Sequence, residues 1–344
     1  MPYLKGMPQP ELIDTPAALA DFCTSARSSA FIAFDTEYLQ DKHYYSRLCL
    51  IQVATEEVAV AIDPLAFGID GWPKGNTPLI GSAPELNPFW ALLADPALPK
   101  VLHAGSNDLE ICYRLTGQVP APVFDTQVAA MACGYSEQIS YQRLVEGICR
   151  KRVAKSARLY HWDKRPLDPR QLSYALDDVI YLREIYRHLS DQLDRRNRRS
   201  WVEEELARLA DPRLYARTPE DAWKTLRSRD VDEGNFSLVK ALCTWREIQA
   251  QRKNLPRRYV LADIDLLRIA SRKPQHLIAN FPTDINLGKQ LKADLLAFLE
   301  QLPEPLAQEL PPQEAGELPP HSQVLLDLLV LLLGLRAAEQ GVAE

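Results

Sequence analysis

The 344-residue chain lacks the cysteine pattern of a disulfide scaffold or a zinc site. Its six cysteines are scattered and none forms a CxxC pair, so we expect buried, reduced thiols in a cytoplasmic protein. The N-terminus lacks the apolar core of a signal peptide, so we do not expect secretion. The most apolar run, Val324–Leu335, has twelve residues and contains Asp327, whereas a membrane span needs about 20 apolar residues. We therefore expect a buried helix there and no membrane partner.

The chain also lacks the overall positive charge that is typical of nucleic-acid-binding proteins, since 40 Lys and Arg face 46 Asp and Glu, a net charge of −6. This charge is distributed unevenly. Residues 143–199 contain 15 basic and 8 acidic residues, whereas residues 300–344 contain one Arg and 8 acidic residues. The pattern predicts a basic surface in the middle of the chain and an acidic tail. The RRNRR run at 195–199 fits either a solvated helix face or a phosphate-contacting patch, and its charge does not distinguish the two.

The first 190 residues alternate between strand and helix patterns. Strands are predicted at 31–34, 48–54, 58–62, 100–103 and 122–124. Helices are predicted at 84–94, 106–115 (with Ser106 as the N-cap), 126–133 and 169–189. The short link at 55–57 predicts an antiparallel hairpin between the second and third strands. Together these elements predict an α/β fold in which helices pack around a mixed sheet.

From about Asp211 the strand patterns disappear and helical patterns replace them. Helices are predicted at 219–226, 235–254, 262–271, 273–279 and 288–299. The first four would form a compact helical module of about 75 residues. The Pro- and Glu-rich stretch at 302–320 has the composition of a linker. A final apolar helix is predicted at 322–338. A lone amphipathic helix cannot bury itself, so we expect either that it packs against another surface or that the chain is cut inside a third module.

The first candidate for catalysis is the pair of carboxylates in Phe34-Asp35-Thr36-Glu37. Residues i and i+2 of a strand point to the same face, so Asp35 and Glu37 would lie side by side at the end of a strand. Two like charges at this separation are unfavourable unless a cation lies between them. The Asp directly follows four apolar residues, which makes a solvated surface pair a poorer explanation.

Two other segments supply further carboxylates. Asp108 falls in the first turn of a predicted helix that follows a strand, where the alternative explanation is helix-dipole complementarity. Tyr174 and Asp178 are i,i+4 neighbours on one helix face, whereas Asp177 is rotated by about 100°. The alternative for this pair is a solvated Tyr–Asp contact. Four carboxylates without Cys or spaced His favour Mg²⁺ or Mn²⁺ over zinc, and two such ions are typical of in-line phosphodiester hydrolysis.

These segments resemble the three exonuclease motifs of the DEDD superfamily: FDTEY at 34–38, HAGSNDLE at 103–110 and YALDDVIYL at 174–182. Tyr174 indicates the tyrosine branch of the superfamily. The chain is similar to the bacterial ribonuclease D family, on the additional evidence of YYSRLCLIQ at 44–52, FDTQ at 124–127 and KSARLYHWDKRPL at 155–167. The helical module at 211–285 resembles the HRDC domain of that family.

The resemblance implies a domain organisation. It comprises an N-terminal extension at 1–20, an RNase H-like 3′–5′ exonuclease domain at 21–205, an HRDC domain at 211–285 and a C-terminal helical segment at 286–344. The family commonly has two HRDC modules, and this chain stops after the first helix or so of the second. We therefore expect either that the protein has lost this module or that the chain is truncated. His161, before Trp162, stands where the family often has an acidic residue.

The resemblance also implies a function, namely 3′–5′ trimming of tRNA precursors and other small structured RNAs to 5′-mononucleotides with two divalent metal ions. Asp35, Glu37 and Asp178 would hold the first ion. Asp35 and Asp108 would hold the second ion, partly through water. Tyr174 would position the attacking water.

The predicted RNA contacts beside the third motif are cations around an aromatic side chain: Lys155, Arg158, Trp162 and Arg165. The alternative is that Trp162 is a core residue and the cations are solvated. A second set of candidate cations lies in the helical module: Arg252, Lys253, Arg257 and Arg258. We expect RNA as the partner and a monomeric protein.

Two functions from other classes remain open. A DNA-directed 3′–5′ exonuclease would use the same motifs, and nothing in the sequence reports recognition of the 2′-OH. A catalytically inactive RNA-binding protein would need a broken carboxylate set, whereas all four carboxylates are present. A helicase is excluded because the sequence has no GxxxxGK[ST] phosphate-binding loop.

Overall fold

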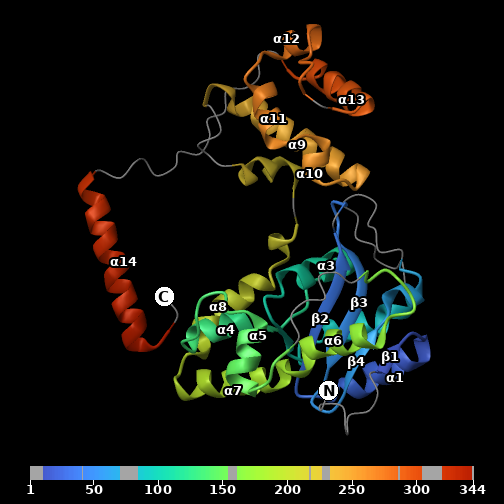
Figure 1. Cartoon of the computed structure of the whole chain (residues 1–344), viewed down its shortest axis with the longest axis vertical. Helices are drawn as coiled ribbons and strands as arrows, with labels where there is room; N and C mark the ends of the chain where they lie inside the picture. Colours follow the sequence, from blue (N-terminus) through green and yellow to red (C-terminus); the bar gives the residue numbers. More distant parts are fainter. Residues whose placement is uncertain are drawn as a thin grey trace.

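The computed structural model describes residues 11–40, 42–69, 84–153, 161–216, 218–226, 233–285, 287–303 and 320–342. Among these, an α/β domain contains all the strands, a helical module follows it, and a single long helix lies apart from that module (Figure 1). The α/β domain and the helical module confirm the fold class that the sequence predicts.

A six-stranded mixed sheet forms the centre of the α/β domain, in the order β1–β4–β3–β2–β5–β6. The strands are β1 (Glu11–Ile13), β2 (Ile32–Leu39), β3 (Arg47–Ala54), β4 (Ala59–Ile62), β5 (Lys100–Leu102) and β6 (Val123–Asp125). The pairs β2–β3 and β3–β4 are antiparallel, and the other neighbouring pairs are parallel. The predicted hairpin of residues 48–54 and 58–62 is therefore confirmed.

Two hydrophobic cores lie on the two faces of this sheet. On one face, Ile32 and Phe34 pack with α1 (Pro16–Ala26), α2 (Asn87–Leu93) and α3 (Ser106–Thr116). On the other face, Ala33 packs with α4 (Thr126–Ala132), α5 (Tyr141–Leu144), α6 (Pro169–Ile180), α7 (Leu182–Arg195) and α8 (Arg199–Leu209). Successive residues of a strand point to opposite faces, so this alternation fixes which helices each later residue of β2 can reach.

The structure corrects four expectations about where elements begin and end. The strand predicted at 31–34 continues to Leu39 as β2, so Asp35 and Glu37 lie within a strand instead of at its end. The helix predicted at 169–189 is divided at Tyr181 into α6 and α7. Ser106 is the first residue of α3, and Gly105 occupies the N-cap position. Residues expected in the N-terminal extension form β1, which pairs in parallel with β4.

The helical module has its own buried core and comprises α9 (Phe236–Lys253), α10 (Arg257–Val260), α11 (Asp263–Ala270), α12 (Pro274–Ala279) and α13 (Lys289–Glu300). The helix predicted at 219–226 is a 3₁₀ helix, Pro219–Thr225. Pro256 and Pro274 each stand at the start of a new helix, because proline lacks the N–H that a helix interior requires. Most of the predicted linker at 302–320 lies outside the described residues.

The C-terminal helix α14 (Pro320–Gln340) was predicted to be buried, and this prediction is wrong for the described structure. Its apolar side chains from Val324 to Leu335 are 42–69% exposed. Its C-terminal end is held, because Arg198 donates hydrogen bonds to the carbonyls of Gln340 and Gly341. None of the described helices has both the length and the hydropathy that a membrane span requires.

Candidate active site

Strand β2 lies in the middle of the sheet, between β3 and β5, and supplies the first two carboxylates. Asp35 and Glu37 follow Ala33 at two-residue intervals, so they point to the face that α6 covers. Both are partly exposed to solvent. The pairing of β2 with β3 shifts register between Glu37 and Tyr38, and such irregularities bend a strand and redirect its side chains. The predicted side-by-side arrangement of the two carboxylates is consistent with this geometry.

Asp108 approaches the same strand from the opposite face. It lies in the first turn of α3, is 7% exposed, and its Oδ1 accepts a hydrogen bond from the Thr36 hydroxyl. Thr36 lies two residues after Phe34 in the strand, so both side chains point to the face that α3 covers. Strand β2 therefore contacts Asp108 through Thr36, the residue that lies between Asp35 and Glu37. No sequence pattern indicated this contact.

Asp125 fixes the turn before α3. It belongs to the FDTQ segment, and no role was predicted for it from the sequence. Its carboxylate accepts hydrogen bonds from Ala104 N at 3.1 Å and Gly105 N at 2.9 Å, and it also caps α4. A Cβ on Gly105 would lie 2.7 Å from Leu102 Cβ, closer than such atoms approach. The glycine and the Asp125 carboxylate together set where α3 begins, and hence where Asp108 lies.

Helix α6 brings the third motif over the sheet. It begins with a capping box at Asp168, and its apolar face (Leu172, Ala175, Leu176 and Val179) is buried. Tyr174 and Asp178 share a partly exposed face, as the i,i+4 spacing predicts. The Tyr141 hydroxyl donates a 2.6 Å hydrogen bond to the Asp177 carbonyl, which holds the last turn of α6 beside Asp178.

The pKa values of all four carboxylates are raised, and at Asp35 and Glu37 the charges of the other site carboxylates contribute. Burial is the first cause at each of them. The pKa of Asp35 is raised well above its usual value by burial and then by the charges of Asp108, Asp178 and Glu37. Burial and the charges of Asp178 and Asp108 raise the pKa of Glu37 to about 8. Burial raises the pKa of Asp108 to about 6, and burial and Asp177 raise that of Asp178 to about 7. Segments far apart in the sequence thus place their negative charges at one site.

The donor set fits a hard divalent cation by its chemistry. Four oxygen ligands without sulfur favour Mg²⁺ or Mn²⁺, and a cation among them removes the mutual repulsion that raises their pKa values. Within the described residues, however, no three His, Cys, Asp or Glu side chains are arranged to hold one ion. Asp108, for example, is hydrogen-bonded to Thr36.

The predicted RNA contacts around Trp162 need correction. Trp162 is 4% exposed and belongs to the core under α6, so it cannot offer a face for a stacked base in this structure. Arg165 donates to the buried Asp63 carboxylate through two nitrogens, and to the Cys49 carbonyl at 2.8 Å. The alternative of a core tryptophan is the one observed. Lys155 and Arg158 lie outside the described residues.

Other candidate cations also have structural partners. In the RRNRR run, Arg198 is 8% exposed and donates to the Ala132 carbonyl at 2.8 Å, while Arg199 pairs with Asp194 at 2.6 Å. Arg198 is thus neither solvated nor available to a phosphate. In the helical module Arg257 is paired with Glu247, whereas Arg252 and Arg258 are exposed.

The fold and the carboxylate site define a class of protein, a 3′–5′ exonuclease. Comparison with known proteins gives the same class: residues 10–194 match the family model described as 3′-5′ exonuclease, and residues 235–279 match the HRDC domain. Two curated relatives are both named Ribonuclease D. The protein from Sphingobium indicum is 39% identical, with 96% of this chain and 84% of the relative covered. The protein from Jannaschia sp. is 38% identical, with 97% and 85% covered.

A solved structure supports the same relationship. Escherichia coli RNase D, described as an exoribonuclease involved in structured RNA processing, is 28% identical with a TM-score of 0.77, covering 97% of this chain and 86% of that chain. The chain belongs to the ribonuclease D family, and it is a hydrolytic 3′–5′ exoribonuclease with an HRDC domain. Membership of this family implies dependence on a divalent metal ion.

Proposed function

We propose that the protein trims the 3′ ends of tRNA precursors and other small structured RNAs, and releases 5′-mononucleotides by two-metal-ion hydrolysis. The observation that carries the proposal is the convergence of Asp35, Glu37, Asp108 and Asp178 from three separate elements, in which the charges of Asp108 and Asp178 raise the pKa values of Asp35 and Glu37. A folded protein maintains this repulsion at the cost of stability, and a cation-dependent reaction is a physical reason to maintain it.

Each residue has a proposed role. Asp35, Glu37 and Asp178 would hold the first ion, and Asp35 and Asp108 would hold the second, partly through water. Bound ions of this kind activate a water and stabilise the leaving oxygen. The Tyr174 hydroxyl, one helical turn from Asp178, orients the attacking water. Asp125 and Thr36 act on the position of Asp108, because one fixes the start of α3 and the other donates to its carboxylate.

The RNA contacts are proposed for the HRDC domain as well as the catalytic site. Arg252 and Arg258 are exposed there, and Arg258 lies over the ring of Tyr259 with 5.2 Å between the guanidinium carbon and the ring centroid. An exposed cation on an exposed aromatic ring is suited to a phosphate or a base. The named tRNA substrate derives from the family resemblance, and E. coli RNase D supports structured RNA as the substrate class.

A direct test compares three matched substrates at one ionic strength: a 3′-extended tRNA, an unstructured RNA and a single-stranded DNA. With Mg²⁺ or Mn²⁺ the protein should release 5′-mononucleotides from a free 3′ end, fastest from the tRNA, and EDTA should abolish release. Undiminished release in EDTA would refute the metal-dependent mechanism. Faster release from DNA than from either RNA would assign the alternative, a DNA-directed exonuclease.

The cellular context is also a proposal. The six cysteines are buried free thiols, which supports a reducing, cytoplasmic location. The monomeric state can be tested by light scattering on the full chain, where a mass near 38.9 kDa is expected. A stable mass of twice that value would contradict the monomer.

A further inference from the structure

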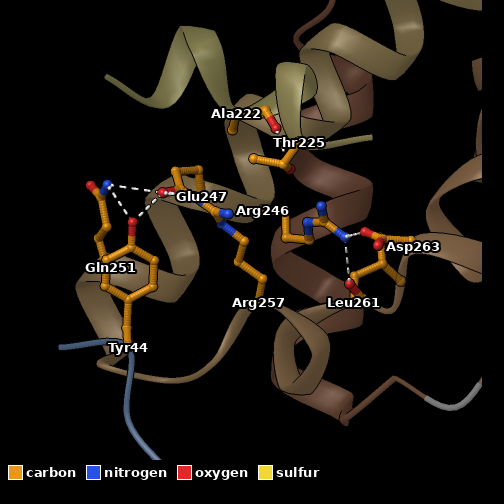
Figure 2. A network of polar contacts seen from close by, with 9 residues as sticks. All are labelled: Tyr44, Ala222, Thr225, Arg246, Glu247, Gln251, Arg257, Leu261 and Asp263. Carbon is orange, nitrogen blue, oxygen red and sulfur yellow. Dashed lines mark hydrogen bonds and ion pairs between the residues drawn. The ribbon is translucent and has the colours of Figure 1, made fainter. Parts of the chain in front are cut away.

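The tip of the β2–β3 hairpin contacts the HRDC domain through two tyrosines. Tyr44 is 9% exposed and Tyr45 is 1% exposed, and both belong to the hydrophobic core of the HRDC domain although they lie about 200 residues away in the sequence. Figure 2 shows Tyr44 reaching from the hairpin toward Glu247 and Gln251 on the ribbon of the helical module. The hairpin tip therefore forms an intramolecular interface between the two domains.

Asn254 holds the backbone of this tip. Its Oδ1 accepts hydrogen bonds from both Tyr44 N and Tyr45 N at 3.1 Å each. Asn254 is also the residue that ends α9, with a left-handed φ of 51°, a conformation that asparagine adopts more readily than most residues. One side chain thus ends a helix of the HRDC domain and binds the loop of the catalytic domain.

A buried ionic network holds the Tyr44 side chain. Its hydroxyl donates to the carboxylate of Glu247, which is 1% exposed. Gln251 Nε2 donates to the Tyr44 hydroxyl at 3.4 Å, and Arg257 Nη2 donates to Glu247 Oε1 at 2.8 Å. A buried carboxylate needs partners for its oxygens, so Tyr44 supplies one of the contacts that make this site favourable.

The same tip is connected to the catalytic elements. It directly follows β2, which carries Asp35 and Glu37. The guanidinium carbon of Arg114 lies 4.6 Å from the centroid of the Tyr45 ring, within the range of a cation–π contact. Arg114 is on α3, the helix that carries Asp108. The interface therefore joins the HRDC domain to the two elements that supply three of the four carboxylates.

We propose that the Tyr44–Tyr45 tip is an interdomain latch. It fixes the HRDC domain relative to β2 and α3, so that a folded RNA contacts the HRDC domain and the catalytic site at the same time. The proposal rests on the proposed function. A short single strand occupies only the catalytic site, whereas a folded RNA held by the HRDC domain gains effective concentration at that site only if the domain is docked. Tyr44 and Asn254 are positioning residues in this scheme.

The test uses the full chain with two variants that remove single groups. Asn254→Gly keeps a residue that tolerates positive φ and removes the shared acceptor, and Tyr44→Phe removes only the hydroxyl. Each hydrogen bond changes a docking equilibrium by about fivefold, so losing both bonds to Asn254 corresponds to on the order of twenty- to thirtyfold. Asn254→Asp retains an acceptor oxygen and serves as the conservative rescue. Ser271→Ala removes the hydroxyl of an exposed residue in the same domain and serves as the matched control.

Two readouts are measured: kcat/KM on a 3′-extended tRNA and on a short single-stranded RNA, and the radius of gyration by small-angle X-ray scattering. We expect Asn254→Gly and Tyr44→Phe to lower kcat/KM on the tRNA by about tenfold, with short-strand activity within about twofold of wild type, and to enlarge the radius of gyration. Asn254→Asp and Ser271→Ala should resemble wild type.

Two outcomes would overturn the latch: unchanged activity on the tRNA, or an equal loss on both substrates, which would indicate a general structural defect. If the wild-type protein trims neither RNA, the proposed function fails. The latch is then decided by scattering alone, and an unchanged radius of gyration in Asn254→Gly overturns it.

Discussion

Replacing Glu37 with Gln should stabilise the metal-free protein while it removes activity. Burial and the neighbouring charges of Asp178 and Asp108 raise the pKa of Glu37 from 4.5 to about 8 in the folded protein. A carboxyl whose folded pKa exceeds its unfolded pKa binds more protons when folded. Stability from this group is therefore complete below about pH 4.5 and is lost as the pH rises toward 8. Glu37→Gln removes the charge that causes this loss.

The expected gain in stability follows from the pKa shift of Glu37. At 1.36 kcal/mol per pKa unit, the full shift corresponds to about 5 kcal/mol for an isolated group. Neighbouring carboxyls protonate and share the repulsion, and a glutamine amide is itself costly to leave unpaired, so a net gain of about 2 kcal/mol at pH 8 is expected. This corresponds to about 5 °C in the melting temperature of a domain of this size.

The assay is thermal unfolding in EDTA at pH 5, 6.5 and 8, followed by circular dichroism. Glu37→Gln should melt increasingly above wild type as the pH rises, and the first transition should be compared because a multidomain chain is not two-state. Mg²⁺ should stabilise the wild type and narrow the difference, because it binds the folded site. An advantage of Glu37→Gln that is equal at pH 5 and pH 8, or absent at both, would refute the electrostatic reasoning.

Five other substitutions test the site and its support. Asp178→Asn should lower kcat by about a hundredfold or more, as the loss of a group that stabilises transition-state charge does, whereas Asp177→Asn should have a much smaller effect in the same mononucleotide-release assay. Tyr174→Phe should lower kcat by a larger factor than it raises KM in steady-state kinetics; the reverse would assign Tyr174 to substrate binding. Gly105→Ala places a Cβ 2.7 Å from Leu102 Cβ, so it should lower the free energy of unfolding by about 1–3 kcal/mol, measured by denaturant unfolding. It should also lower kcat by displacing α3. Arg165→Ala leaves its 5% exposed carboxylate partner unpaired and should destabilise the fold by about 3 kcal/mol; unchanged stability with weakened RNA binding would restore Arg165 as an RNA contact.

Local periodicity determined which residues could carry the chemistry. The two-residue repeat of a strand places Asp35 and Glu37 on one face, and the four-residue repeat of a helix places Tyr174 and Asp178 on another. Both patterns depend only on near neighbours in the chain, so they can be recognised from the sequence without the tertiary structure. The alternation of strand and helix patterns before residue 190, and its loss afterwards, predicted the α/β domain and the helical module for the same reason.

Tertiary packing decided what the remaining groups do. The sequence marks Trp162 and Arg165 as an aromatic and a cation, but the burial of Trp162 against α6 and the pairing of Arg165 with Asp63 are properties of the folded chain. The contact between Thr36 and Asp108, and the docking of Tyr44 on Asn254 and Glu247, join residues separated by 72 to 210 positions. Which distant groups meet depends on how helices cover the two faces of the sheet and on where the hairpin tip ends, and neither is encoded in a local repeat. The sequence by itself thus specified the candidate catalytic residues and the elements that carry them, whereas only the tertiary structure determined which cations remain exposed and how the two domains are joined.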